Sequence, residues 1–158
     1  MLMDIGLDAF QPGLVTLLRV GLGAAVLWLF PKTRVPIDKA DRPRVITLSV
    51  IWVAIPFTLF PNAQQWINSA LAGMLNGGMP IFAAAIASLM LRRLPRGTHL
   101  AGVVIGFVGV VAIASPSLGE GSSEALGVTL VLLATVCYGL AVTIATPIQQ
   151  RYGSLPVM

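Results

Sequence analysis

Apolar residues form five long runs along the chain, and short segments between the runs contain nearly all the charged residues. A helix needs about 20 mostly apolar residues, with a range of about 17–25, to cross the hydrocarbon core of a bilayer. We therefore predict an all-α membrane protein, a polytopic bundle of about five transmembrane helices. The expected helices cover residues 12–30, 45 to about 60, about 66 to 91, 99 to about 114, and 126 to about 146.

Prolines lie at the ends of these runs or interrupt them. Pro12 suits the opening turn of the first helix, where the missing N–H has no helix partner to lose. Pro56 interrupts the second run and Pro61 closes it. Because proline breaks the hydrogen-bond ladder of a helix, we expect Pro116 and Pro147 to end the fourth and fifth helices.

Basic residues occur only in alternate segments between the runs. Outside the runs, nine Lys and Arg residues lie in the first segment, the third segment and the C-terminal tail. They are Lys32, Arg34, Lys39, Arg42, Arg44, Arg92, Arg93, Arg96 and Arg151. The other segments carry only acidic charges, at Asp4, Asp8, Glu120 and Glu124. The positive-inside rule then predicts a multi-pass protein of the cell inner (plasma) membrane, with its N-terminus outside and its C-terminal tail cytoplasmic.

The composition supports the same class of protein. Hydrophobic residues make up 56% of the chain and charged residues 10%, whereas an average soluble domain is about one-quarter charged. The net charge of +4 comes from the short loops, so it indicates contact with anionic lipid rather than nucleic acid. The single cysteine, Cys137, cannot form an intramolecular disulfide. Paired carboxylates, a nucleophile with a neighbouring base, and a metal-ligand cluster are all missing from the sequence, so we expect no enzyme activity, metal or cofactor.

Arg19 is the one charged residue inside a predicted span. An arginine at the centre of a membrane helix costs about 2.5–3.5 kcal/mol on the insertion scale, so such a residue is a candidate for function. It lies seven residues after Pro12, about 10 Å along the helix axis. Two interpretations stay open: attraction of an anionic substrate group, or a structural role against the carbonyls of neighbouring helices.

The third run carries a polar face. On one continuous helix, Gln65, Ser69 and Asn76 lie within about 40° of one another, with Asn68 nearby. We predict that this face, together with Arg19, lines the substrate path. The alternative is that these side chains form hydrogen bonds between packed helices.

The same run contains a predicted helix break or hinge. Gly77, Gly78 and Pro80 follow the polar face directly, and Pro56 gives the second run a similar interruption. Irregular backbone at membrane depth is tolerated only against protein or a water-filled cavity. Gly/Pro-interrupted spans therefore point to a transporter binding site.

Further glycines are spaced for close contact between helices. Gly73 and Gly77 are four residues apart in the third run, as are Gly102 and Gly106 in the fourth. Such spacing lets backbones approach closely, so we predict helix packing at Gly73, Gly102, Gly106 and Gly109.

With these residues placed, the sequence resembles the EamA family of the drug/metabolite transporter superfamily. PGLVTLLRVGLGAAVLWLF is similar to the family's second helix, with Arg19 at its characteristic arginine, and LAGMLNGGMPIFAAAIASLML to the fourth, with Pro80 at the family proline. HLAGVVIGFVGVVAIA is similar to the fifth helix and carries the family glycines. GVTLVLLATVCYGLAVTIATPIQQRYGSLPV resembles the opening helix of the family's second repeat.

The resemblance implies a fold and an activity. Family members are usually ten-helix proteins of two inverted five-helix repeats around a central cavity, and they move small metabolites, often by exporting amino acids or related compounds. On this template, residues 1–116 are a first repeat without its first helix, and 117–158 begin a second repeat. The chain is then a partial transporter, and pairing with a second half-transporter is one way to complete it.

One position departs from the family pattern. Members commonly carry a Glu at the end of the fourth helix, and this chain has Arg92 or Arg93 there. Whatever that Glu does is therefore not carried over to this chain.

Other functions stay open at this point. One alternative is a non-transporting membrane subunit or an inactive transporter fragment. Another is a small multidrug exporter, which would need an intramembrane carboxylate that none of the five runs contains.

Overall fold

The computed structural model describes residues 11–33, 35–92, 97–119, 122–154 and 157, and its regular elements are all helical. The five predicted runs are found as helices. Four stretches of the described chain are long and apolar enough to cross a membrane: Arg42–Ala63, Ser69–Met90, Thr98–Pro116 and Ser123–Tyr152. The first run forms a shorter apolar helix, Gly13–Trp28. The prediction of a polytopic helical bundle is confirmed.

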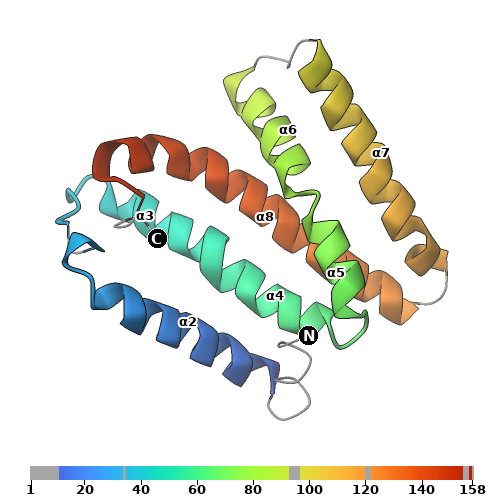
Figure 1. Ribbon diagram of the computed structural model, residues 1–158, viewed down its shortest axis with the longest axis horizontal. Helices are drawn as coiled ribbons and strands as arrows, with labels where there is room; N and C mark the ends of the chain where they lie inside the picture. The colour runs from blue at the N-terminus through green and yellow to red at the C-terminus, as the bar shows by residue number, and fades with distance from the viewer. Residues whose placement is uncertain (1–10, 34, 93–96, 120–121, 155–156, 158) are drawn as a thin grey trace.

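Several of the five runs comprise more than one element (Figure 1). The first run is α2 (Pro12–Trp28), followed by the short η1 (Pro31–Thr33). The second run comprises α3 (Arg42–Ser49), η2 (Val50–Ala54) and α4 (Ile55–Ala63). The rest of the bundle consists of α5 (Ser69–Asn76), α6 (Met79–Leu91), α7 (Thr98–Gly119) and α8 (Ser122–Tyr152).

The helix ends gather at two opposite sides of the bundle. In Figure 1, the end of α2, the start of α3 and the end of α8 lie toward the left, and the end of α6 and the start of α7 lie toward the top. The start of α2, the end of α4, the start of α5, the end of α7 and the start of α8 lie toward the lower right. Consecutive spans therefore run antiparallel, and the segments predicted to be basic and non-basic attach to opposite sides of the bundle.

Part of the charge pattern falls outside the described residues. These positions are Asp4, Asp8, Arg34, Arg93, Arg96 and Glu120. The predicted location of the N-terminus lies outside them as well.

The prolines end fewer helices than predicted. Pro56 does not stop the second span, because a five-residue segment that ends two positions before it, Val50–Ala54, widens into a π-helical turn. This turn accommodates the proline ring and its missing N–H. Pro61 lies inside α4, which continues to Ala63.

The fourth and fifth spans also continue past their prolines. Pro116 lies inside α7 and Pro147 inside α8. Pro116 leaves the carbonyl of Ala112 without its usual donor, and the Ser115 hydroxyl donates to that carbonyl at 3.1 Å. A membrane helix can thus retain a proline when a nearby group replaces the lost hydrogen bond.

The third span is two helices rather than one. It begins at Ser69, not near Trp66, and α5 ends at Asn76. Gly77 and Gly78 form the turn that separates α5 from α6, and Pro80 lies in the first turn of α6.

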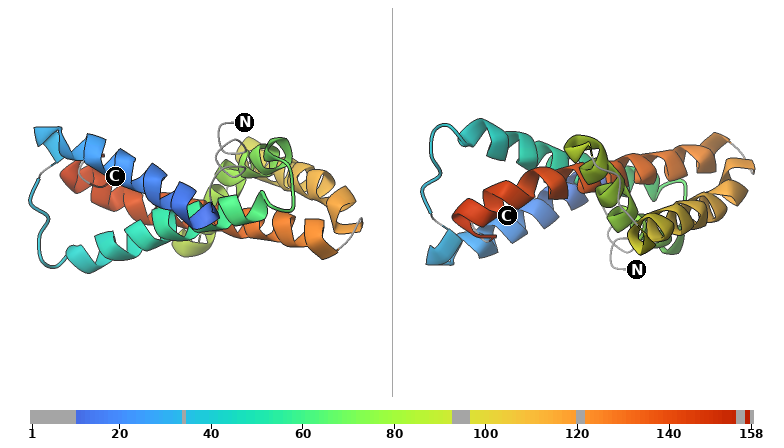
Figure 2. Two further views of the ribbon diagram at one scale, coloured as in Figure 1. Left: turned by 90° about the horizontal axis from the view of Figure 1, so that it is seen from below. Right: turned by 90° about the horizontal axis from the view of Figure 1, so that it is seen from above.

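The long helix α8 forms the centre of the bundle. It packs extensively against both α4 and α6. Its first half joins a buried cluster with α4, α5 and α7, and its second half joins another with α3. In Figure 2, α3 lies beside the C-terminal half of α8, and α7 lies beside its N-terminal half. The α5–α6 turn lies near the middle of α8 (Figure 1).

Candidate functional site

Side chains from four helices line one small cavity near the middle of the bundle. They are Arg19 of α2, Phe57 and Phe60 of α4, Asn76 at the end of α5, and Tyr138 of α8. The cavity has a volume of about 140 Å³. Its walls therefore combine one cation, one amide and three aromatic rings.

Arg19 lies near the midpoint of α2. The Arg19 Cζ is 5.0 Å from the centroid of the Phe57 ring. A guanidinium above an aromatic face is stabilised by the ring quadrupole, by about 0.5–1 kcal/mol at exposed sites and more when water is removed. The ring of Phe57 therefore helps to hold a charge at a depth where charges are costly.

Asn76 contributes a polar atom that has no partner among the described residues. Its side-chain Oδ1 is buried and accepts no hydrogen bond there. A buried acceptor left in this way costs about 1–3 kcal/mol. Because Asn76 also lines the cavity, this atom can accept a hydrogen bond from a bound donor.

The aromatic wall joins α4 to α8. The ring centroids of Phe60 and Tyr138 are 6.1 Å apart, with a 32° angle between the ring planes. This separation is in the range of favourable aromatic pairs. It gives the cavity an apolar wall in addition to its polar groups.

The turn after α5 determines where Asn76 lies. If α5 continued into α6, residues 76–80 would form one regular helix, but Gly77 and Gly78 interrupt it. At Gly78, a Cβ would lie 2.7 Å from Cγ2 of Val110 on α7. Glycine is therefore required for the close approach of the turn to α7.

The structure brings only part of the predicted polar face to the cavity. Gln65 is exposed in the connection between α4 and α5, and its Nε2 donates to Asn62 at 3.4 Å. Asn68 is the N-cap of α5, where its Oδ1 accepts from the Leu71 N–H at 2.8 Å. Ser69 is the half-buried first residue of α5. Of the polar residues predicted in the third span, Asn76 is the one that lines the cavity with Arg19.

The alignment of Gln65 with Asn76 assumed one helix from residue 65 onward. Because the chain is not helical between Ala63 and Ser69, that assumption is wrong. The neighbouring Gln64 instead has a buried Oε1 with no partner in the described structure.

Close helix contacts occur mostly at other glycines than those predicted. Gly106 contacts Ile81 of α6, whereas a Cβ at Gly73, Gly102 or Gly109 would meet no described atom within 4 Å. Packing at these three positions is therefore not formed by the described residues.

The tightest approach of two backbones involves a glycine that the sequence did not single out. At Gly139 of α8, a Cβ would lie 2.8 Å from the backbone nitrogen of Ala83 on α6. Gly127 lies similarly close to Ile67 and to the carbonyl of Ala63. The glycines of α8 thus allow it to occupy the centre of the bundle.

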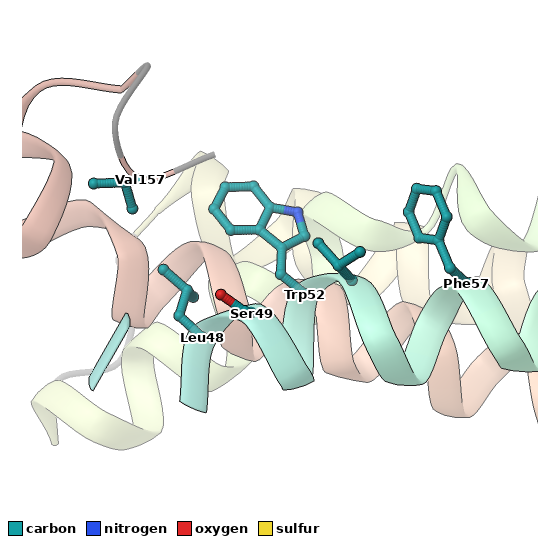
Figure 3. A pocket seen from close by; sticks show the side chains of 6 residues that line it. Leu48, Ser49, Trp52, Phe57 and Val157 are labelled. Carbon is teal, nitrogen blue, oxygen red and sulfur yellow. The ribbon is translucent and has the colours of Figure 1, made fainter. Parts of the chain in front are cut away.

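A second, apolar pocket lies along α3, η2 and the start of α4. Its volume is about 220 Å³, and its lining is shown in Figure 3: Leu48, Ser49, Trp52, Val53, Phe57 and Val157. The chain turns back after α8 at Gly153, whose φ of 85° favours glycine. Phe57 lines both this pocket and the Arg19 cavity.

A separate polar cluster joins the start of α3 to the end of α8. Asp41 is only 5% exposed. It forms ion pairs with Arg44 at 3.4 Å and Arg151 at 3.2 Å, and it accepts a hydrogen bond from the Tyr152 hydroxyl at 2.9 Å. The Tyr152 hydrogen bond, helped by the two arginines, holds the pKa of Asp41 below the ordinary carboxyl value of 3.8. This cluster ties two segments predicted to be cytoplasmic to each other.

Three residues that line the cavity, and a fourth that bonds to one of them, were not predicted from the sequence. Phe57, Phe60 and Tyr138 are aromatic residues in apolar runs, which usually indicate an ordinary core. Thr16, which donates to the backbone of Phe57, has no sequence signal except its position one turn before Arg19. Pro61 lies four residues after Phe57, and its missing N–H leaves the Phe57 carbonyl without its helix donor. That spacing was the available clue in the sequence.

Comparison with known proteins identifies the family. The model of the EamA-like transporter family matches residues 1–115. An uncharacterized transporter of Archaeoglobus fulgidus is 25% identical over 115 residues, which are 73% of this chain and 40% of that protein. The match thus covers about two-fifths of the length of this relative. No solved structure matches this chain. The family match covers well over half of the chain, and this protein therefore belongs to the EamA-like transporter family.

Proposed function

We propose that this chain contributes the substrate cavity of a membrane transporter for small metabolites that carry a carboxylate, such as amino acids and related compounds. The observation that carries the proposal is the pairing of Arg19 with the orphaned Asn76 acceptor in one cavity at mid-span. Other transporter folds place substrate sites in this way, near the bilayer midplane and beside interrupted helices.

The two polar groups suit two parts of one ligand. A guanidinium binds a carboxylate strongly, because both groups are planar and their hydrogen bonds are assisted by charge. The Asn76 Oδ1 accepts a hydrogen bond, so it suits an adjacent ammonium or hydroxyl group. The rings of Phe60 and Tyr138 provide apolar contact for the rest of a small molecule.

Ligand-induced stabilisation of the purified protein in detergent tests the proposal. Three small probes differ by one group each: L-alanine, L-alaninamide, which lacks the carboxylate, and propionate, which lacks the amino group. We expect L-alanine to raise the Tm most, propionate less and L-alaninamide not at all, because a bound ligand stabilises the folded state. Equal shifts with L-alanine and L-alaninamide would contradict a carboxylate site at Arg19.

We also propose that transport requires a second half-transporter. The family resemblance supports this, since residues 117–158 resemble the start of a second repeat, and Gly102 and Gly109 face no described atom. We expect liposomes that contain only the 158-residue chain to take up no more L-alanine than liposomes without protein. Robust uptake by this chain alone would overturn the requirement.

We propose that the protein lies in the cell inner membrane, with its basic segments on the cytoplasmic side. The alternating charges and the Asp41–Arg151 contact between two such segments support it. Single cysteines introduced at Lys39 and at Ser123, in a Cys137→Ser background, should react with a membrane-impermeant thiol reagent from opposite sides. Labelling of both from the same side would contradict this threading.

A further inference from the structure

We infer that Thr16 is a positioning residue for the Arg19 cavity, because its hydroxyl replaces a helix hydrogen bond that Pro61 removes from Phe57. In this way Thr16 holds α2, and Arg19 with it, against α4. The inference rests on the proposed function for its effect on substrate, and on the structure alone for its effect on α2.

Pro61 creates the need for this bond. In an α-helix the N–H of residue 61 would donate to the carbonyl of residue 57, four positions earlier. Proline has no N–H and its ring crowds that carbonyl. The Phe57 oxygen is therefore left without its helix donor inside an apolar bundle, where a missing hydrogen bond is expensive.

Thr16 supplies the missing donor from another helix. Its hydroxyl donates to the Phe57 carbonyl oxygen at 2.7 Å, and the group is partly buried. Thr16 and Arg19 are three residues apart, so they lie on the same face of α2. Phe57 therefore contacts α2 twice: its carbonyl oxygen accepts a hydrogen bond from Thr16, and its ring lies beneath the Arg19 guanidinium.

The bundle covers the described side chains of α2 only in part. No described side chain of α2 is buried, and a large apolar groove of about 830 Å³ separates part of α2 from α3 and α4. Thr16 itself lies at this groove, among Gly13, Val20 and Val53. Because Thr16 lies at the edge of this groove, its hydrogen bond to Phe57 directly restrains the separation of α2 and α4.

The first experiment measures the separation directly and does not depend on transport. Spin labels on cysteines at Leu22 of α2 and Ile46 of α3, both well exposed, report the inter-helix distance in a Cys137→Ser protein. We expect Thr16→Val to broaden and lengthen the distance distribution, and Thr16→Ser to leave it unchanged. An unchanged distribution in Thr16→Val would overturn the inference.

A second change tests the role of Pro61. Pro61→Ala restores an N–H that can donate to the Phe57 carbonyl, so the Thr16 hydroxyl becomes redundant. We therefore expect the Thr16→Val, Pro61→Ala double variant to differ from Pro61→Ala much less than Thr16→Val differs from the wild type. Equal effects of Thr16→Val in both backgrounds would show that the hydroxyl does not replace the lost bond.

A third experiment tests the effect on substrate, by measuring L-alanine affinity from the ligand-dependent Tm shifts described above. We expect Thr16→Val to weaken L-alanine binding about three- to tenfold, the equivalent of one hydrogen bond, and Thr16→Ser to restore it. If distance changes but affinity does not, Thr16 docks α2 without positioning Arg19, and that part of the inference is wrong. If the wild type binds no L-alanine, the proposed function fails, and the distance arm still decides whether Thr16 holds α2.

Discussion

Two polar clusters in this molecule have opposite characters. At the ends of α3 and α8, Asp41 has two arginines and a tyrosine as partners. In the middle of the bundle, the Arg19 cavity keeps a space of about 140 Å³, and the Asn76 Oδ1 has no partner among the described residues. The first cluster satisfies its buried acceptor, and the second leaves one unsatisfied.

This difference indicates that the Asp41 cluster stabilises the helix packing, whereas the Arg19 cavity is suited to bind a ligand. A buried polar network with all its partners present favours one arrangement of the helices. An unsatisfied buried group lowers stability, and binding sites often retain such groups because a ligand can satisfy them. Substitutions in the two clusters should therefore change different properties: stability at Asp41, and binding at Arg19 and Asn76.

The largest expected effect is on binding, at Arg19. Arg19→Gln removes the charge that would hold a carboxylate, and a hydrogen bond to a charged group contributes about 1.5–3 kcal/mol. We expect L-alanine affinity to fall at least about tenfold, measured by the concentration dependence of Tm. Arg42→Gln, which removes an exposed arginine outside the cavity, is the matched control and should bind as the wild type does. Equal losses in the two variants would assign the effect to net charge instead.

The next effect is on stability, at Asp41. Asp41→Asn removes the counter-charge of Arg44 and Arg151, so we expect a clear fall in Tm and unchanged L-alanine affinity. Glu124→Gln is the control, because it removes a carboxylate in the first turn of α8, at the opposite end of that helix from the cluster. A loss of binding with no loss of stability in Asp41→Asn would remove the distinction between the two clusters.

A pH titration sharpens the same point. Because the folded pKa of Asp41 lies below its ordinary value of 3.8, the ionised carboxylate stabilises the fold above that value. This stabilisation is lost as the pH falls through the folded pKa. Wild-type Tm should therefore fall more steeply than that of Asp41→Asn below about pH 4. Parallel curves would show that Asp41 does not contribute to the acid sensitivity.

The smallest effect on stability is a gain, at Asn76. Asn76→Leu replaces an unsatisfied amide by an apolar side chain of similar size, so we expect about 1 kcal/mol of added stability. The same variant should lose its response to L-alanine. Gln65→Ala, at a residue that the sequence assigned to the same polar face, should change neither property. A destabilised Asn76→Leu protein would show that the amide has a partner in the native bundle.

The sequence predicted the helices well, for a physical reason. The bilayer imposes the same requirements for length, hydrophobicity and loop charge on every span, so these features can be predicted from the sequence. The same uniform rule misjudged the prolines, because Pro61, Pro116 and Pro147 remain inside helices. Local groups such as Ser115 replace the lost bonds, and no one-dimensional pattern shows which group will lie nearby.

The candidate site was predicted only in part. Arg19 and Asn76 were found because polar residues are rare in apolar runs. Gln65 and Asn68 were assigned to the same face because a helical projection continues through residues that in fact form a connection and a cap. Aromatic wall residues such as Phe57 could not be distinguished from core residues without the crossing of α2, α4 and α8.

The glycines show the same limit. Regular spacing selected Gly73, Gly102 and Gly109, which face no described atom, whereas the closest backbone approach is at Gly139. Spacing reports which residues share a face of a helix, but only the assembled bundle shows which face meets a neighbour.

Protection of a cavity residue by ligand tests the central claim most directly. Phe60→Cys and Gln65→Cys, each in a Cys137→Ser background, would be labelled with a small water-soluble thiol reagent in the presence of L-alanine or L-alaninamide. The cavity account predicts that L-alanine slows labelling at residue 60 and not at residue 65, and that L-alaninamide slows neither. Equal labelling rates at residue 60 with and without L-alanine, in protein that reacts fully, would contradict it.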